Sequence, residues 1–346
     1  MTGPVFTSTP PGVTVAICTY NGAARLPATL EHLRAQVVPP KVPWEVIVID
    51  NASTDDIAGV AQRCWPDDSS TQLRIVREPK LGLSNARLRA FCEARHEIVS
   101  FVDDDNWVSQ DWVKIVSSVM QENPDLGALG SLVYPVCEVN PPEWFEVFRH
   151  RYATLTAADL AKIDNLVILH GAGLSVRKAA WEDIFTNGFR FSVPGRRGNN
   201  LSGCEDTELT CALKLADWRL YIEPRLSMRH FLPANRLTWK YLRRLSRENG
   251  AAELDAYFFV HQTRDSGVVD RLRQFWFWHF LLAGASVARR PSAVLGLILG
   301  REGDRAILDA EGLYGRMVNL LRLRSGYARK RREVREASWR RRETLG

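Results

Sequence analysis

The chain has 346 residues and a formal net charge of +6, with 45% hydrophobic and 25% charged residues. This composition is that of a globular protein and excludes disordered, collagen-like and disulfide-scaffold classes. The six cysteines form no CxxC pair and no metal-ligand spacing, so we expect reduced thiols, as in the cytoplasm. The N-terminus shows neither the basic nor the apolar segment of a secretory signal.

Positive charge is concentrated at the C-terminal end. Residues 316–346 contain 11 Lys and Arg against 3 Glu. Such a segment is usually a solvated helix or tail, and the more specific alternative is a segment that contacts anionic lipid. We expect no nucleic-acid partner, because aromatic residues do not interleave with the basic ones here.

Short apolar strands alternate with amphipathic helices along the first half of the chain. The strands are expected at 13–17, 45–50, 73–77 and 98–102, and the helices at 26–36, at 54–63, from 84 and from 109. This alternation predicts βαβ units and a parallel sheet with both faces covered. Ligands of such sheets bind beyond the carboxyl ends of the strands.

Polar residues follow three of these strands. They are Thr19, Tyr20 and Asn21 after the first, Asp50 and Asn51 after the second, and Asp103, Asp104 and Asp105 after the fourth. Asp50 has a plain alternative role as the cap of the helix at 54–63. Three adjacent carboxylates repel one another, and a divalent cation such as Mg²⁺ or Mn²⁺ relieves that repulsion. The triplet therefore favours a metal site over a turn.

Several nucleotide and hydrolase motifs are absent from the sequence. There is no G-x-G-x-x-G after the first strand, no P-loop and no H-E-x-x-H. The segment Gly82–Ala86 is no nucleophile elbow, because it lacks the final glycine. Dinucleotide, P-loop and zinc-protease functions are thereby unsupported.

Six segments in order resemble the family-2 glycosyltransferases. They are VAICTYN (15–21), EVIVIDNASTD (45–55), GLSNARLRA (82–90), FVDDD (101–105), HGAG (170–173) and CEDTEL (204–209). The resemblance implies an α/β GT-A fold, which is Rossmann-like and typical of nucleotide-diphospho-sugar transferases. It also implies a metal-dependent, inverting hexosyltransferase of the EC 2.4 type with a DxD motif.

The resemblance also assigns expected roles to single residues. The nucleotide would be bound by Thr19, Tyr20, Asn21, Asp50, Arg87, Asp103 and Asp104. The Mn²⁺ or Mg²⁺ ion would be held by Asp105, Asp103 and His230, with His230 placed after the last strand. Gly171 and Gly173 would let the backbone approach the donor sugar, although a tight turn explains them equally well. For Arg87 the alternative is a helix-surface arginine.

The segment CEDTEL supplies the expected general base. A helix is predicted at 205–216, which places Asp206 in its first turn, where the helix dipole favours an ionised carboxylate. Asp206 is the expected base, and Glu205 is its neighbour, alternative catalytic residue and sugar or acceptor contact. The segment 192–203 is rich in glycine and arginine and is either a mobile lid or a surface loop. Arg236 could pair with phosphate.

The family resemblance fades beyond about residue 250. We expect a flexible N-terminus (1–12), a GT-A domain (13–250) and a helical, basic C-terminal region (251–346). Residues 275–288 are apolar but too few to span a bilayer, and a second apolar stretch follows at 292–300. These helices either pack on the catalytic domain or contact a membrane peripherally through 275–300 and the basic tail.

The predicted function is sugar transfer from a nucleotide-diphosphate sugar, with UDP as the expected nucleotide, to a saccharide or lipid-linked acceptor. Polysaccharide biosynthesis at the cytoplasmic face of the membrane is the expected setting. A nucleotidylyltransferase and a non-catalytic saccharide-binding subunit are the alternatives. The first would need a glycine-rich triphosphate loop, and the second would predict a disabled DDD or CED segment; neither feature is found.

Overall fold

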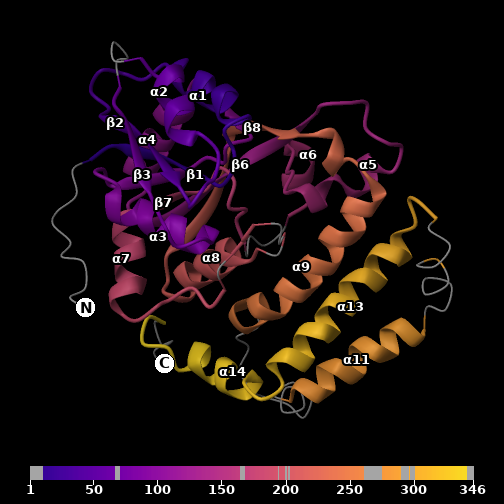
Figure 1. The fold of residues 1–346 in the computed structure, drawn as a ribbon. Coiled ribbons are helices and arrows are strands. Elements are labelled where there is room, and N and C mark those ends of the chain that lie inside the picture. The colour runs from indigo at the N-terminus through magenta and orange to yellow at the C-terminus, as the bar shows by residue number, and fades with distance from the viewer. Residues whose placement is uncertain are drawn as a thin grey trace.

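The computed structural model describes residues 11–66, 71–163, 168–193, 195–198, 201, 203–260, 275–289, 296 and 301–340. In these parts a mixed eight-stranded sheet with helices on both faces lies beside a helical C-terminal region (Figure 1). Of the expected flexible segment 1–12, residues 1–10 lie outside the described residues. Of the apolar stretch 292–300, only Gly296 is described.

The first half of the sheet is parallel, with the strand order β3-β2-β1-β4. Its strands are β1 (Val13–Thr19), β2 (Trp44–Asp50), β3 (Leu73–Arg77) and β4 (Ile98–Phe101). The connecting helices are α1 (Leu26–Arg34), α2 (Ile57–Cys64) and α3 (Leu83–Glu93). All four strands that the sequence predicts here are confirmed, and their carboxyl ends lie at one edge.

The second half of the sheet, which lies beyond the strands that the sequence predicts, is mixed. It contains β5 (Asn106–Val108), β6 (Leu126–Cys137), β7 (Ser175–Arg177) and β8 (Arg219–Leu232), in the order β7-β6-β8-β5. Strand β7 runs antiparallel to both of its neighbours. This antiparallel pairing begins at the end of β4, where the Gly173 N–H donates to the Phe101 carbonyl and the Phe101 N–H donates to the Leu174 carbonyl.

Helices cover both faces of the sheet, as the alternation of apolar residues requires. In β1, Val15 and Ile17 belong to one core and Ala16 to the other. The first core is closed by α1, α2 and α4 (Trp112–Glu122). The second is closed by α3, α7 (Lys178–Thr186) and α8 (Glu205–Leu215). The sheet is therefore buried between two helical layers.

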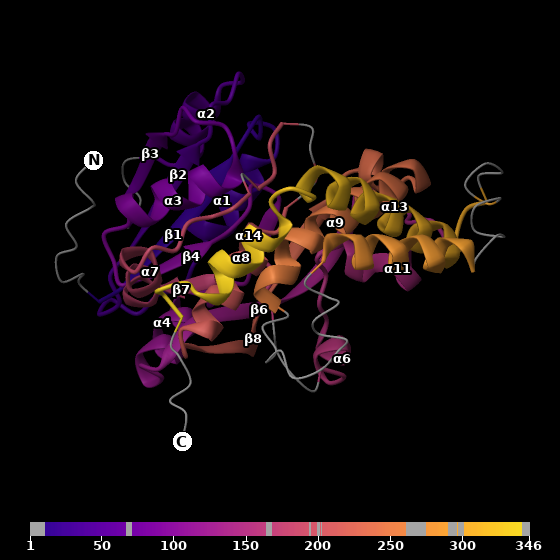
Figure 2. The same ribbon diagram turned by 90° about the horizontal axis from the view of Figure 1, so that it is seen from below.

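In its described residues the C-terminal region contains four helices, and Figure 2 shows the longer ones side by side next to the sheet. They are α9 (Trp239–Val260), α11 (Trp276–Ala288), α13 (Arg305–Leu323) and α14 (Tyr327–Arg335). Helix α9 is continuous across the expected domain boundary at 250, and its Leu254 and Phe258 join the core of the sheet domain. Short helical turns fill the connection after β6 and the turn after β8, namely α5 (Phe145–Phe148), η1 (Arg149–Tyr152), α6 (Ala157–Leu160) and η2 (Ala234–Arg236).

Within the described ranges, no helix combines the length and the apolar character needed to cross a membrane.

Candidate active site

The predicted strand ends come together around a pocket of about 200 Å³. Backbone bonds tie the first two ends to each other, because the Asn51 N–H donates to the Thr19 carbonyl at 2.9 Å. The pocket is lined by Cys18, Thr19, Tyr20, Arg25, Asn51, Leu81, Leu83, Ala86, Asp103, Asp104, Asp105, Arg196, Gly198, Leu201 and Arg236. Five of the predicted site residues are thus in one cavity wall: Thr19, Tyr20, Asp103, Asp104 and Asp105.

Asn21 and Asp50 lie at the same edge but hold the loop after β2. Asn21 adopts φ +48° and accepts hydrogen bonds from Thr54 through its side-chain oxygen. Asp50 accepts from the Ser53 N–H at 2.9 Å and pairs with Arg77 at 2.8 Å. The idea that Asp50 caps the following helix was wrong, because α2 begins at Ile57 and its N-cap is Asp56.

The Asp104 carboxylate is already bound by side chains of the protein. Its carboxylate accepts from Arg25 at 2.8 and 3.0 Å and from the Thr19 hydroxyl at 2.5 Å. Burial and the neighbouring charge of Asp105 raise the pKa of Asp104 to about 6, while Arg25 and Thr19 oppose the rise. This side chain therefore fastens the loop after β1 to the aspartate triplet, which leaves Asp103 and Asp105 for other ligands.

Asp105 lies between two cationic groups at the far end of the pocket. Its carboxylate is 2.9 Å from Arg236 Nη1 and 3.7 Å from His230 Nε2. Burial alone would raise the pKa of Asp105, but His230 and then Arg236 hold it well below the ordinary value of an aspartate. Asp105 therefore stays ionised, as a metal ligand must.

His230 is not beyond the last strand, as the sequence suggested, but within it. Strand β8 extends to Leu232, and His230 faces Asn106 of β5 across the sheet. Its Nδ1 lies 3.1 Å from the Tyr152 carbonyl, which can only accept, so Nδ1 carries the proton. The other ring nitrogen, Nε2, lies 3.7 Å from Asp105, on the side where it could bind a metal that Asp105 also binds.

Asp103 completes the acidic wall. Among the residues that the structure describes, none donates a hydrogen bond to its carboxylate. Burial, followed by the charge of Asp105, raises the pKa of Asp103. A divalent cation would remove both penalties, so the donor set of two carboxylates and one imidazole fits Mg²⁺ or Mn²⁺.

A complete metal cage is not formed by the protein alone. No group of three or more His, Cys, Asp or Glu in the described part of the chain is arranged to hold an ion. Mg²⁺ commonly takes one or two carboxylates and completes its shell with water and substrate phosphates. The site therefore fits an ion that arrives together with a diphosphate.

A second cluster lies next to the pocket at the start of α8. Asp206 is in the first turn, as predicted, and accepts from the Gly171 N–H at 2.8 Å and from the Thr207 N–H at 2.7 Å. Glu205 is 3% exposed, and its Oε2 has no hydrogen-bond partner among the residues that the structure describes. Burial raises the pKa of Glu205, and Arg87 partly lowers it again.

Arg87 is not a helix-surface residue. It is 2% exposed, its Nη1 lies 3.5 Å from Glu205 Oε1, and its guanidinium packs over the ring of Phe101. A Cβ at Gly171 would overlap this guanidinium, which explains the glycine without a ligand. Gly173 adopts φ +72°, so the tight-turn explanation applies to it as well.

The loop at 192–203 covers both clusters in its described residues. The Leu83 N–H donates to the Arg196 carbonyl at 3.1 Å, and the Ser84 hydroxyl donates to the Val193 carbonyl at 2.7 Å. A Cβ at Gly195 would lie within 3.1 Å of Glu205 side-chain atoms. The described residues of this loop therefore lie over Glu205 as well as beside the pocket at the strand ends.

Sequence reasoning missed several pocket residues, chiefly Arg25, Asn51 and Arg196. Arg25 lies between the first motif and the helix that follows it, where nothing in the local pattern points to a partner 79 positions away. Asn51 was noticed only as the neighbour of Asp50, yet it is the residue that lines the cavity. Arg196 was noticed only as part of a basic loop.

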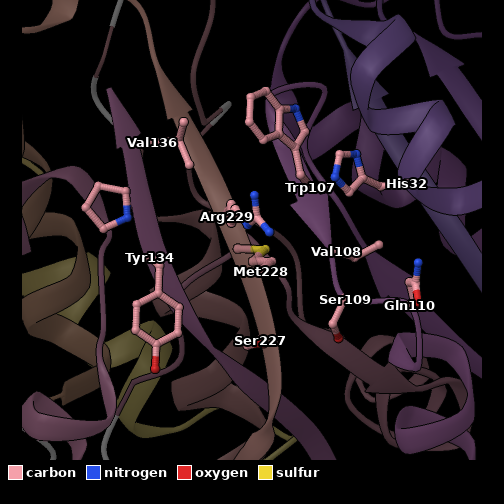
Figure 3. A pocket seen from close by; sticks show the side chains of 11 residues that line it. His32, Trp107, Val108, Ser109, Gln110, Tyr134, Val136, Ser227, Met228 and Arg229 are labelled. Atoms are coloured by element: carbon pink, nitrogen blue, oxygen red, sulfur yellow. The ribbon is translucent and has the colours of Figure 1, made fainter. Parts of the chain in front are cut away.

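A second hollow, of about 410 Å³, lies on the other side of β5 and β8 (Figure 3). Trp107 and Arg229 face each other in register there, in the pair next to Asn106 and His230 and hence on the opposite face of the sheet. Trp107 is stacked between His32 and Phe231. No carboxylate lines this hollow, so we place the candidate reaction centre at the aspartates.

The fold is shared with a solved structure. The mannosyltransferase PcManGT from Pyrobaculum calidifontis, in complex with GDP-Man and Mn²⁺, aligns over 91% of this chain and 88% of its own, with 18% identity and a TM-score of 0.57. The chain therefore has the GT-A fold of nucleotide-sugar glycosyltransferases.

The N-terminal half of the chain shows which family it belongs to. Residues 14–185 match the model described as "Glycosyl transferase family 2", and the chain belongs to this family.

Two curated relatives agree with this assignment. The putative glycosyltransferase EpsH of Bacillus subtilis is 24% identical over 116 residues, 34% of this chain and 32% of its own length. The glucosyl-dolichyl phosphate glucuronosyltransferase of Haloferax volcanii is 25% identical over 133 residues, 38% of this chain and 42% of its own length. The matches thus span well under half of these relatives.

Proposed function

We propose that this protein is an inverting glycosyltransferase that moves a sugar from a nucleotide-diphosphate sugar, with UDP as the nucleotide, to an acceptor hydroxyl. The observation that carries the proposal is that Asp103 and Asp105 line one pocket, with His230 3.7 Å from Asp105 and a carboxylate cluster on α8 beside them. The family membership of residues 14–185 supports it.

The leaving diphosphate would be bound at the acidic wall. A Mg²⁺ or Mn²⁺ ion held there by Asp105, Asp103 and His230 would supply Lewis-acid stabilisation of the departing negative charge. Arg236, which is 2.9 Å from Asp105, could turn its guanidinium to a phosphate oxygen once the ion neutralises that carboxylate. The chain's own part is to keep Asp105 ionised and in place.

The nucleotide would occupy the pocket beneath the ends of β1 and β2. Thr19 and Tyr20 line this pocket directly, while Asn21 and Asp50 shape its rim through their bonds to Thr54 and Ser53. Arg87 would act through the electrostatic attraction between its guanidinium and the carboxylates of Asp103 and Glu205. We propose that the donor sugar lies near Gly171 and Gly173.

Asp206 is the proposed general base. The acceptor oxygen attacks the anomeric carbon from the face opposite to the diphosphate, the new C–O bond forms, and the old bond breaks with its electron pair on the diphosphate. The acceptor proton passes to the Asp206 carboxylate. The N–H groups of Gly171 and Thr207 orient this carboxylate in the first turn of α8.

The test is a screen of nucleotide sugars for slow, metal-dependent hydrolysis, followed by transfer to saccharide acceptors. Asp206→Asn should abolish transfer and leave metal-dependent donor binding intact, because the amide keeps the shape but cannot take the proton. Glu205→Gln is the matched variant, one position earlier in the same turn. Substantial transfer by Asp206→Asn together with loss in Glu205→Gln would reassign the base to Glu205.

The acceptor is proposed to be a saccharide or lipid-linked saccharide in polysaccharide biosynthesis. The proposed location is the cytoplasm, with peripheral contact to the inner face of the cell membrane. The apolar segment 275–289 and the basic segment after Arg316 support that location. Co-sedimentation of active protein with membranes from the producing cell tests it, and recovery of all activity without membrane would contradict it.

A further inference from the structure

Helix α11 has one face packed and one face exposed. Between Phe275 and Ala288 the sequence contains no Asp, Glu, Lys or Arg. Ala283 is buried, and Trp276 and Phe280 pack against the main core. The remaining large side chains face solvent: 64% of Phe275, 53% of Phe277, 46% of Leu281 and 47% of Leu282 is exposed. The predicted packing on the catalytic domain therefore accounts for one face of this helix, and the other face is left exposed.

The composition of this face indicates a membrane interface. Aromatic residues gather at the N-terminal end of α11, at positions 275–278 and 280. Aromatic side chains prefer the boundary between headgroups and acyl chains. The helix has 13 residues and a length of about 20 Å, so it can lie in that boundary but cannot cross a hydrocarbon layer of about 30 Å.

Exposed arginines lie beside the same end of α11. The His279 ring is 5.7 Å from the Tyr327 ring, which places the first half of α11 at the junction of α13 and α14. Figures 1 and 2 both show α14 beyond this end of α11. Exposed arginines flank the junction on both sides: Arg322, Arg324, Arg329 and Arg332. A cationic strip next to an apolar face complements an anionic lipid surface.

We propose that Phe275, Phe277, Leu281 and Leu282, together with the arginines around the α13–α14 junction, form a docking surface for a bilayer that contains anionic lipid. The proposal rests on the proposed function, because a transferase with a lipid-linked acceptor must work at a membrane. It adds which surface faces the lipid and which lipid charge it selects. The helix lies flat and partly embedded, and the arginines contact the headgroups.

The test is flotation of the full chain with vesicles of phosphatidylcholine alone or mixed with phosphatidylglycerol. We expect binding to the mixed vesicles that weakens as salt is raised, and little binding to phosphatidylcholine alone. The variant Phe277→Ser/Leu281→Ser should lower the partition coefficient by about tenfold or more. Val37→Ser, an equally exposed apolar residue 65% accessible on the sheet domain, should leave it unchanged.

The charge contribution has its own pair of variants. Arg329→Glu/Arg332→Glu should lower binding to the mixed vesicles, and Lys114→Glu, at an exposed site on α4, should change it little. Donor hydrolysis by each variant shows that the fold is intact and separates this inference from the proposed function. Full donor turnover without vesicle binding would overturn the docking surface alone. A dimer in the absence of lipid that Phe277→Ser/Leu281→Ser disrupts would also overturn it, because a second copy would then be the partner.

Discussion

The buried pair Arg87–Glu205 gives the sharpest prediction about stability. The two residues are 2% and 3% exposed, and 3.5 Å separates Nη1 from Oε1. At an effective dielectric constant of about 20, this separation corresponds to about 5 kcal/mol of attraction. Removing one member of a buried pair commonly costs about 3–5 kcal/mol, because the other charge is left without a partner. We therefore expect Arg87→Met to lower the free energy of unfolding by about 3–5 kcal/mol.

The pH dependence of this loss follows from Glu205. Burial already raises its pKa above the ordinary 4.5, and Arg87 is the main group that lowers it. Without Arg87 the pKa of Glu205 in the folded state rises further, so the folded state binds more protons than the unfolded state. Stability must then fall as pH rises from about 4.5 through the raised pKa of Glu205. The loss in Arg87→Met should be smallest at the acidic end of this range.

Urea unfolding at several pH values measures the effect, with Arg89→Met as the control on the same helix. Arg89 is 42% exposed and pairs with Glu93 four residues later, so its loss should cost no more than about 0.5 kcal/mol. The double variant Arg87→Met/Glu205→Gln should regain part of the lost stability, since no buried carboxylate remains unpaired. Equal losses in Arg87→Met and Arg89→Met, or a loss that is independent of pH, would refute the reasoning.

Two further outcomes follow from the structure. Gly315→Ala should lower the free energy of unfolding in urea by about 1–3 kcal/mol, because a Cβ there would overlap the Arg247 carbonyl where α13 packs on α9. Gly284→Ala is the control, because a Cβ at that position would have no atom within 4 Å. Equal effects of the two substitutions would contradict the close packing of α13 on α9. Chelation with EDTA should stop donor hydrolysis and added Mn²⁺ should restore it, and full turnover in EDTA would count against a metal at Asp103 and Asp105.

The parallel half of the fold was predictable from local pattern. Strands at 13–17 and 45–50 are continuous apolar runs because both faces of the sheet are buried, and Leu26, Leu30 and Leu33 mark one face of the helix between them. The mixed half was not predictable in this way. Strand β7 has only three residues, and it pairs antiparallel with strands that are distant in the sequence, which its own pattern does not indicate.

The candidate site likewise contains some residues that the sequence could predict and others that it could not. The acidic residues could be found from sequence, because each follows a strand whose end must lie at the ligand edge. The arginines that pair with these acidic residues could not be found from sequence. Arg25 reaches Asp104 across 79 positions, and Arg236 reaches Asp105 across 131, so only the folded chain shows which carboxylate is already used. The position of His230 was misjudged because β8 continues through a proline and several charged residues that read as a strand end.

The three consecutive aspartates differ in role because the chain turns between β4 and β5. Asp104 points to the loop after β1 and is held by Arg25 and Thr19. Asp105 points toward β8, where His230 and Arg236 keep it ionised. Asp103 has neither kind of partner, and its pKa is raised by burial and then by Asp105. A divalent ion held by Asp103 and Asp105 would stabilise the charged form of Asp103 and would be a partner for Asp105 in place of Arg236. The Arg236 guanidinium would then be available to a diphosphate at the same place.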